Sequence, residues 1–132
     1  MTDHRSTSPH WQPLTNLKQF DQILERSKSK PALVLKYHPN TSESELIKKS
    51  LDQNWNIGTA ELDMYLVDVS RDTKVSHEVT EVAGVDHEYP QVLLFADGVT
   101  MYDESHDLIN VKKIKIALKI INRTFKWMET RV

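Results

Sequence analysis

Apolar residues follow two different spacings in the first part of the chain. Before Pro31 they recur every three or four positions, which predicts a helix with one apolar face. These positions are Leu17, Phe20, Ile23 and Leu24. Thr15 is placed to cap this helix, and the polar segment 27–30 ends it. The run 32–35, Ala-Leu-Val-Leu, contains no polar position and therefore predicts a strand buried on both faces of a parallel sheet.

The next segments repeat this alternation of helix and strand. Segment 37–45 combines a proline with possible N-cap residues and early carboxylates, which is typical of a loop that enters a helix. A second apolar strand is predicted over 62–69. A helix then starts at Ser70 or Asp72 and ends at Gly84, a typical C-cap.

The last third of the chain predicts a hairpin followed by an amphipathic helix. Segment 91–95 is apolar, and the Asp97-Gly98 turn leads into segment 99–102, so the two segments pair antiparallel. Over 111–128 one stripe of the helix is apolar and most of the remainder carries lysine and arginine. The apolar stripe consists of Ile114, Leu118, Ile121, Phe125 and Met128.

The order of these elements predicts an α/β fold. Two parallel crossovers followed by a hairpin give a four-stranded mixed sheet with helices on both faces, which is the thioredoxin-like arrangement. In that arrangement the proline before the hairpin, Pro90, is usually cis and lies beside the loop at 37–43. We expect residues 1–10 to form a flexible lead-in and residues 11–132 a single domain, with Trp11 fixing the lead-in to the body.

Composition excludes several kinds of chemistry. The chain of 132 residues has no cysteine, so it can form no disulfide, iron–sulfur cluster, thiolate zinc site or thiol nucleophile. Its three glycines lie more than ten residues apart, which excludes a glycine-rich phosphate loop, and no Gly-x-Ser-x-Gly elbow is present. Without a membrane span or a secretory signal, the sequence is expected to be cytoplasmic.

Charge is distributed unevenly along the chain. Residues 59–107 carry 2 basic and 12 acidic side chains, whereas residues 108–132 carry 7 basic and 1 acidic. This distribution predicts an acidic face on the middle of the fold and a basic last helix. Nucleic-acid binding is not expected, because aromatic residues do not interleave with the cations of that helix.

A stretch around Pro90 resembles a known family. Segment 84–95, Gly-Val-Asp-His-Glu-Tyr-Pro-Gln-Val-Leu-Leu-Phe, is followed by Asp97-Gly98 and Ser105-His106 and is similar to monothiol bacilliredoxins of the YtxJ type. Trp11, Leu14-Thr15, segment 23–28 and Pro31 agree as well. The resemblance covers most of residues 11–107. It implies a thioredoxin-like fold and thiol–disulfide chemistry with bacillithiol.

The loop that carries this chemistry in the family departs from the family pattern here. The family strand leads into Lys-His-Ser-Thr-x-Cys-Pro-x-Ser, and the matching segment 36–44 reads Lys-Tyr-His-Pro-Asn-Thr-Ser-Glu-Ser. The cysteine position therefore falls on Thr41, which is a poor nucleophile without an adjacent base. We expect no catalytic residue, no cofactor and no metal. The residues expected to shape a retained binding site are His38, Pro39, Asn40, Thr41, Ser42, His87, Tyr89 and Pro90.

Several functions stay open at this stage. The sequence favours a non-catalytic binding or regulatory module for a protein partner or a small anionic or thiol ligand. The alternative is bacillithiol-linked redox homeostasis, acting through a partner's cysteine. A third possibility is a structural subunit that forms a homodimer or a hetero-complex through an exposed sheet edge or the acidic face. Simple structural roles compete with each assignment: Thr41 and Ser42 as helix caps, Glu43 and Glu45 as partners of the helix dipole, and Tyr89 as a ring packed on Trp11 or on the 37–43 loop.

Overall fold

The structure, a computed structural model, describes residues 9–130, with side chains described up to residue 124. Most of the lead-in expected over residues 1–10 lies outside the described residues. The side chains of Phe125 and Met128, expected on the apolar stripe of the last helix, lie outside them too.

Helices and strands alternate along the chain in the predicted order. The strands are β1 (Gln12–Pro13), β2 (Ala32–Tyr37), β3 (Asp63–Asp68), β4 (Gln91–Ala96) and β5 (Val99–Ser105). The helices are α1 (Leu17–Arg26), α2 (Ser42–Asn54), α3 (Thr73–Ala83), the short 3-10 helix η2 (His106–Leu108) and α4 (Val111–Thr130). Among the described helices, none is long and apolar enough to cross a membrane.

The strands form one mixed sheet in the order β1-β3-β2-β4-β5. β2 pairs parallel with β3 and antiparallel with β4, and β4 pairs antiparallel with β5. The predicted parallel crossover from β2 to β3 is therefore present, whereas the prediction that β4 also runs parallel was wrong, because hydrophobic periodicity does not specify strand direction. The sheet thus has five strands where the sequence predicted four. The additional strand, β1, has two exposed residues and no apolar pattern, and Pro13 can join only a sheet edge because it lacks a backbone donor.

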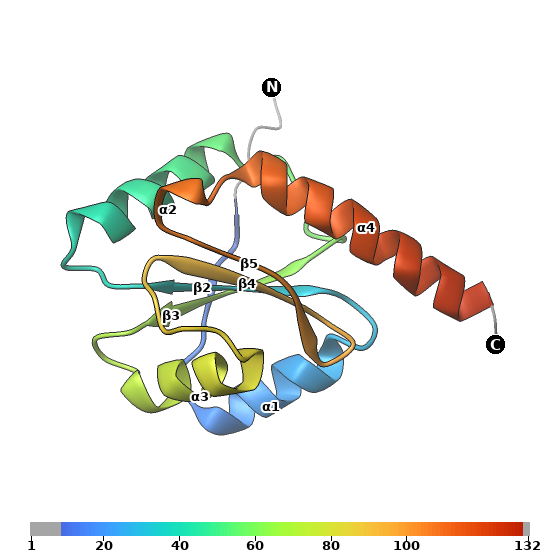
Figure 1. Ribbon diagram of the computed structural model, residues 1–132, viewed down its shortest axis with the longest axis horizontal. Coiled ribbons are helices and arrows are strands. Elements are labelled where there is room, and N and C mark those ends of the chain that lie inside the picture. Colours follow the sequence, from blue (N-terminus) through green and yellow to red (C-terminus); the bar gives the residue numbers. More distant parts are fainter. Residues whose placement is uncertain (1–8, 131–132) are drawn as a thin grey trace.

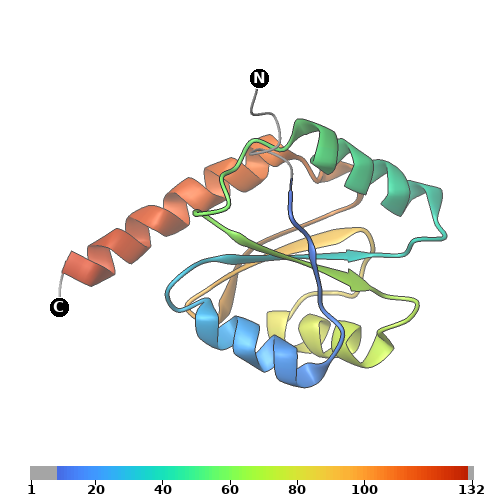
Figure 2. The ribbon, with the colours of Figure 1, turned by 180° about the vertical axis from the view of Figure 1, so that it is seen from behind.

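Helices cover both faces of the sheet, with α2 and α4 on one face and α1 and α3 on the other (Figures 1 and 2). Side chains alternate between these faces along β2. Leu33 and Leu35 pack in the core with residues of α2 and α4, whereas Ala32 and Val34 pack with residues of α1 and α3. The strand is buried on both faces, as its uninterrupted apolar run predicts.

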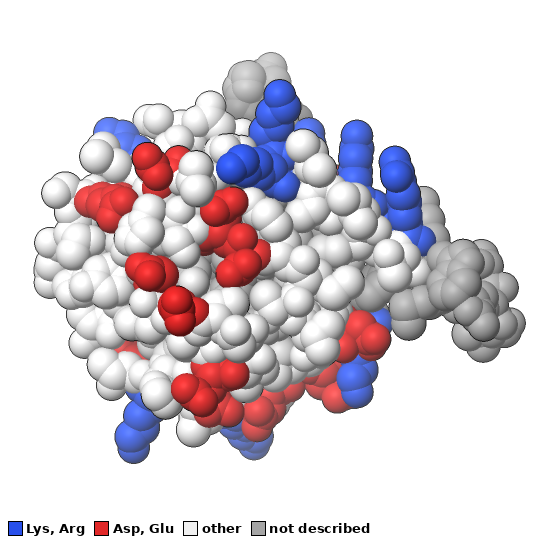
Figure 3. All heavy atoms as spheres, viewed as in Figure 1, with Lys and Arg blue, Asp and Glu red and all other residues white. Residues whose placement is uncertain are grey.

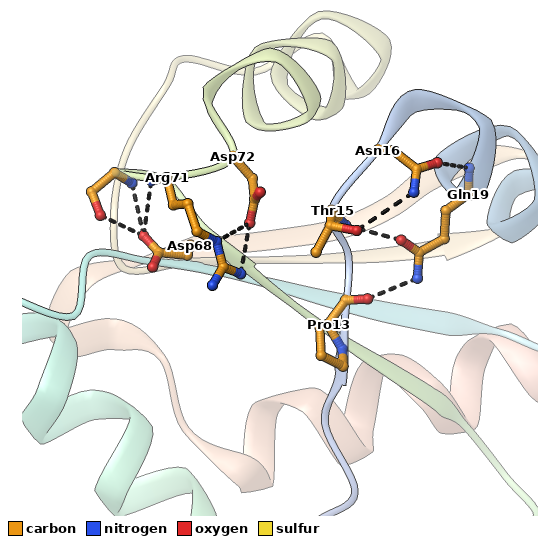
Figure 4. A network of polar contacts seen from close by, with 8 residues as sticks. Pro13, Thr15, Asn16, Gln19, Asp68, Arg71 and Asp72 are labelled. Carbon is orange, nitrogen blue, oxygen red and sulfur yellow. Dashed lines mark hydrogen bonds and ion pairs between the residues drawn. The ribbon is translucent and has the colours of Figure 1, made fainter.

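The start of α1 differs by one residue from the prediction. Asn16, rather than Thr15, is the N-cap, and its side-chain oxygen accepts a hydrogen bond from the backbone N–H of Gln19 at 2.9 Å. The Gln19 side chain in turn accepts from the Thr15 N–H and donates to the carbonyl of Pro13 (Figure 4). These bonds tie the beginning of α1 to β1.

Trp11 packs against the body of the protein. Its indole nitrogen donates to Asp52 at 2.8 Å, and its ring packs against Trp55 with centroids 6.1 Å apart. Both partners lie at or just after the end of α2. Trp11, which immediately precedes β1, is therefore held on the α2 side of the sheet.

The predicted turns and charge distribution are present in the structure. Gly84 caps α3 in the left-handed conformation, with φ 69°, and Gly98 adopts φ 78° in the hairpin turn. In Figure 3 basic side chains project along α4, whereas carboxylates gather over the middle of the same face. The carboxylate-rich surface includes the region around the start of α2.

Candidate functional site

The loop between β2 and α2 is organised around His38. The backbone carbonyl of His38 accepts hydrogen bonds from both the N–H and the hydroxyl of Thr41, at 3.1 and 2.9 Å. Nδ1 of the His38 ring accepts from the N–H of Asn40 at 3.2 Å, and the His38 N–H donates to the buried hydroxyl of Ser44. Pro39 and Asn40 form the turn between these bonds. The loop therefore has a defined conformation.

Thr41 is the N-cap of α2, but its side chain does not cap the helix. Its hydroxyl donates to the preceding backbone instead, and no basic side chain accepts that proton. The neighbouring Ser42 is exposed at the first position of the helix. Thr41 consequently lacks the base that would make its hydroxyl a nucleophile.

Tyr89 and two histidines form an aromatic cluster beside this loop. The Tyr89 ring lies 5.4 Å from the His38 ring and 5.8 Å from the His87 ring, measured between centroids. Tyr89 is 36% exposed and precedes Pro90 through a cis peptide bond, whereas Pro90 itself is buried. Tyr89 thus packs on the 37–43 loop and still presents one face to solvent, while Trp11 packs elsewhere.

Lys36 lies directly beneath this cluster and is fully buried. Its ammonium donates to Thr80 Oγ1 at 2.6 Å, to Gln91 Oε1 at 3.0 Å and to Nδ1 of His87 at 2.8 Å. Burial lowers the pKa of Lys36 to about 8, and the charge of Glu88 partly opposes this shift. The pKa of His87 is lowered by burial and by the adjacent Lys36 cation.

His106 joins the two segments that border the cluster. Its ring contacts Glu88 through Nε2 at 2.8 Å and Glu43 through Nδ1 at 3.1 Å. Its backbone N–H donates to the carbonyl of Pro90 at 2.9 Å. The hydrogen bonds to Glu88 and Glu43 raise the pKa of His106. An imidazole between two carboxylates thus connects the start of α2 with the segment before β4.

The structure brings together part of the predicted site. His38, His87 and Tyr89 meet in one cluster, and Thr41 and Pro90 border it, whereas the exposed Asn40 and Ser42 make no side-chain contact in that cluster. Within the described part of the chain, no group of three or more histidine or acidic side chains is arranged to hold a metal ion.

Two features of the site were missed by sequence reasoning. The first is the buried ammonium of Lys36. The sequence did indicate this burial, because Lys36 follows Val34 by two positions and so lies on the same face of a buried strand. The second is the bridge from His106 to Glu43, which joins positions 63 residues apart. The pattern of the sequence near either residue carries no sign of that second contact.

Comparison with solved structures identifies the fold as thioredoxin-like. A protein with a thioredoxin fold, described as a candidate oxidoreductase, is 25% identical to this chain, with a TM-score of 0.69 over 80% of this chain and 90% of that one. A Malassezia sympodialis thioredoxin has a TM-score of 0.69 at 16% identity, covering 92% and 98% of the two chains. A Trypanosoma brucei brucei thioredoxin has a TM-score of 0.66 at 11% identity, covering 92% and 99%.

Comparison of the sequence with protein families gives a more specific result. Among curated proteins none matches the chain. The family described as monothiol bacilliredoxin BrxC matches residues 12–114, which run from β1 into the first turn of α4 and include the whole candidate site. The chain therefore belongs to the monothiol bacilliredoxin BrxC family, although it contains no cysteine.

Proposed function

We propose that this protein is a binding module that keeps the bacilliredoxin scaffold without its thiol chemistry. The observation that carries the proposal is the environment of Thr41, which the family resemblance matches to the cysteine position and which donates its hydroxyl to the carbonyl of His38. A threonine cannot form a mixed disulfide, and this one has no base to activate it. Any function at this site then depends on noncovalent binding of a ligand.

The surface around Thr41 favours a peptide segment of a partner protein as the ligand. Tyr89 offers an exposed aromatic face between two imidazoles, a kind of surface that contributes to recognition of protein segments. Glu43 and Glu88 border the cluster and disfavour an anionic ligand such as bacillithiol. A neutral or basic segment fits this charge better.

A photo-crosslinking experiment tests this proposal. Benzoylphenylalanine replaces Tyr89 in one variant and Leu46 in a control variant, since Leu46 is 66% exposed on α2 and outside the aromatic cluster. We expect a discrete covalent adduct with a cellular protein from position 89 and none from position 46. Equal labelling from both positions, or none from either, would contradict the proposal.

An amide-shift titration by NMR tests the small-ligand alternative. Bacillithiol and a thiol-free analogue of its malate-glycoside part serve as the two probes. Saturable shifts confined to residues 38–44 and 87–91 would show that the ligand is a small molecule of the bacillithiol type and not a peptide. If the shifts require the thiol, the analogue will leave these residues unchanged.

Membership of the family favours a second candidate function, bacillithiol-linked redox homeostasis through the cysteine of a partner protein. In that case the chain would position a mixed disulfide for a thiol supplied in trans. The purified chain alone should then show no turnover of a bacillithiol mixed disulfide, while addition of its partner should produce turnover. Turnover by the chain alone would contradict both candidate functions, because no residue here can carry the thiol step.

A further inference from the structure

A groove lies between the end of α2 and the start of α4, at the opposite end of α2 from Thr41 (Figures 1 and 2). Its volume is about 640 Å³. Leu51 and Val111 close its base and are themselves almost fully buried. The apolar side chain that a ligand would meet is Ile116, which lines the groove and is 52% exposed.

Three lysines of α4 stand along this groove, namely Lys112, Lys115 and Lys119. Spacings of three and four residues place them on one side of the helix, where their like charges repel one another. None of the three forms an ion pair with a described residue. The neighbouring Lys113 is paired with Glu104 and lies outside the groove. The groove therefore carries a concentrated positive charge that its own wall leaves unbalanced.

The rest of the lining is neutral. Among the described residues that line the groove, none is acidic. Asp52, which follows Leu51 on α2, is already bound by Lys48 and by the indole of Trp11. The polar lining besides the lysines consists of Ser50, Asn54, Asn56 and Asn110. Asparagine amides both donate and accept hydrogen bonds, as the backbone of a bound peptide requires.

We propose that this groove is a docking site for an acidic segment of a partner protein. Charge complementarity favours this occupant, because its carboxylates pair with the three lysines and relieve their mutual repulsion. An apolar side chain of the same segment covers Ile116. The proposal does not depend on the function proposed for the surface around Thr41, whose bordering carboxylates, Glu43 and Glu88, favour a segment of the opposite charge.

Other occupants fit the groove less well. Single-stranded nucleic acid is bound through aromatic rings on which bases stack, and the described lining contains no aromatic residue. A membrane surface is flat, whereas this groove is recessed between two helices. Residues 1–8 of this chain carry one acidic and one basic side chain, so charge does not favour them as the occupant.

Fluorescence anisotropy of the full chain with a labelled peptide tests this proposal. The probe is a fluorescein-labelled peptide of glutamate and leucine arranged at helical spacing, and the control peptide has glutamine in place of every glutamate. We expect saturable binding of the glutamate peptide with a dissociation constant of about 100 μM or below, and binding of the glutamine peptide about tenfold weaker. Added salt should weaken the binding. Equal binding of the two peptides, or no saturable binding, would overturn the proposal.

Three further measurements compare the competing occupants. Oligothymidylate DNA and phosphatidylserine vesicles are titrated at the same salt concentration as the glutamate peptide. Tighter binding of either one would overturn the proposal in favour of nucleic acid or of a membrane. Analytical ultracentrifugation of the chain alone tests for a second copy. A dimer that dissociates when the three lysines of the groove are replaced would also overturn the proposal.

Substitution of lysines locates the binding. Replacing the three lysines of the groove, as Lys112→Gln, Lys115→Gln and Lys119→Gln together, should weaken binding of the glutamate peptide about tenfold or more. The matched control removes the same charge from three exposed lysines outside the groove, as Lys18→Gln, Lys28→Gln and Lys74→Gln together. It should change the affinity less than about twofold. Equal affinity in wild type and the first variant would contradict the assignment even if the peptide bound elsewhere.

Ile116→Gln tests the apolar part of the contact. It should weaken binding about fivefold, because Ile116 loses the apolar area that the peptide covers. Ile120→Gln is the matched control, since Ile120 is 58% exposed on the same helix but does not line the groove. A loss of affinity in Ile120→Gln equal to that in Ile116→Gln would contradict the proposed position of the segment.

Discussion

The ammonium nitrogen of Lys36 lies 2.8 Å from Nδ1 of His87, and the two residues belong to segments 51 positions apart in the chain. Lys36 is the last fully buried residue of β2, and His87 stands on the surface just before Pro90. This contact joins the interior of the α3 face to the aromatic cluster around Tyr89. A single buried cation therefore acts on a histidine of the aromatic cluster.

The buried ammonium should make stability depend on pH in a defined direction. The pKa of Lys36 is about 8 in the folded protein and 10.5 ordinarily, so the unfolded chain binds more protons between these values. Stability therefore rises as the pH increases from 8, by at most about 3 kcal/mol over the full interval. Urea denaturation at several pH values between about 8 and 9.5 measures this slope.

The variant Lys36→Met is the control for this dependence of stability on pH. Methionine has a similar length and no charge, so the contribution of Lys36 to the pH dependence should disappear in the variant. The pH range stops below 10 because Tyr102, whose pKa is raised to about 12, adds a slope of opposite sign once unfolded tyrosine ionises. Equal slopes in wild type and variant would show that Lys36 titrates normally.

His106 should titrate above the usual range of histidine. Its contacts with Glu88 and Glu43 raise its pKa, so they stabilise the fold fully below pH 6.5 and lose their effect as the pH rises through the folded pKa. The shift of the imidazole Cε1 proton, followed by NMR against pH, measures this pKa directly. Glu88→Gln should lower it more than Glu43→Gln, since Glu88 makes the shorter contact. An unchanged pKa in both variants would contradict the bridge.

Substitutions at the N-terminus of α1 should affect stability differently at Asn16, the N-cap, and at its neighbour Thr15. Asn16→Ala removes the acceptor for the Gln19 N–H and should cost about 1 kcal/mol of stability. Thr15→Ala should cost much less, because only the backbone N–H of Thr15 takes part in the Gln19 contact. Chemical denaturation of both variants provides the comparison. A larger loss of stability in Thr15→Ala than in Asn16→Ala would show that Thr15 is the N-cap, as the sequence pattern predicted.

Local patterns predicted the parts of the fold that local physics determines. The uninterrupted apolar run of β2, the Asp97-Gly98 turn and the C-cap at Gly84 are each specified within a few residues. The cap at Asn16 was missed by one position because the chain before it is fixed from outside, by the bond from the Leu14 N–H to the carbonyl of Leu66. No local pattern could supply that contact.

The candidate site was predicted less completely because its contacts span long distances in the sequence. The resemblance to the family placed Thr41 and Pro90 next to each other. The side chains that set the charge of the site, Lys36 and His106, act through partners that are 51 and 63 positions away. Such pairs depend on strand order and register, which hydrophobic periodicity does not specify.

Restoring the cysteine tests whether the scaffold can still support thiol chemistry. In Thr41→Cys the thiol stands at the N-terminus of α2, where the helix dipole favours the thiolate, so its pKa should fall below the usual 8.5. Thiolate absorbance against pH measures this pKa. We expect the variant to form a mixed disulfide with bacillithiol disulfide at neutral pH, which intact-mass spectrometry detects.

Ser50→Cys is the matched control for this variant, because Ser50 is exposed on the same helix, far from its N-terminus. Its thiol should titrate near 8.5 and react more slowly. The carboxylates Glu43 and Glu45 in the first turn of α2 act against the dipole, so the shift at position 41 should increase when Glu43→Gln is added. If Cys at position 41 reacts no faster than Cys at position 50, the loss of chemistry extends beyond the missing sulfur to the electrostatics of the loop itself.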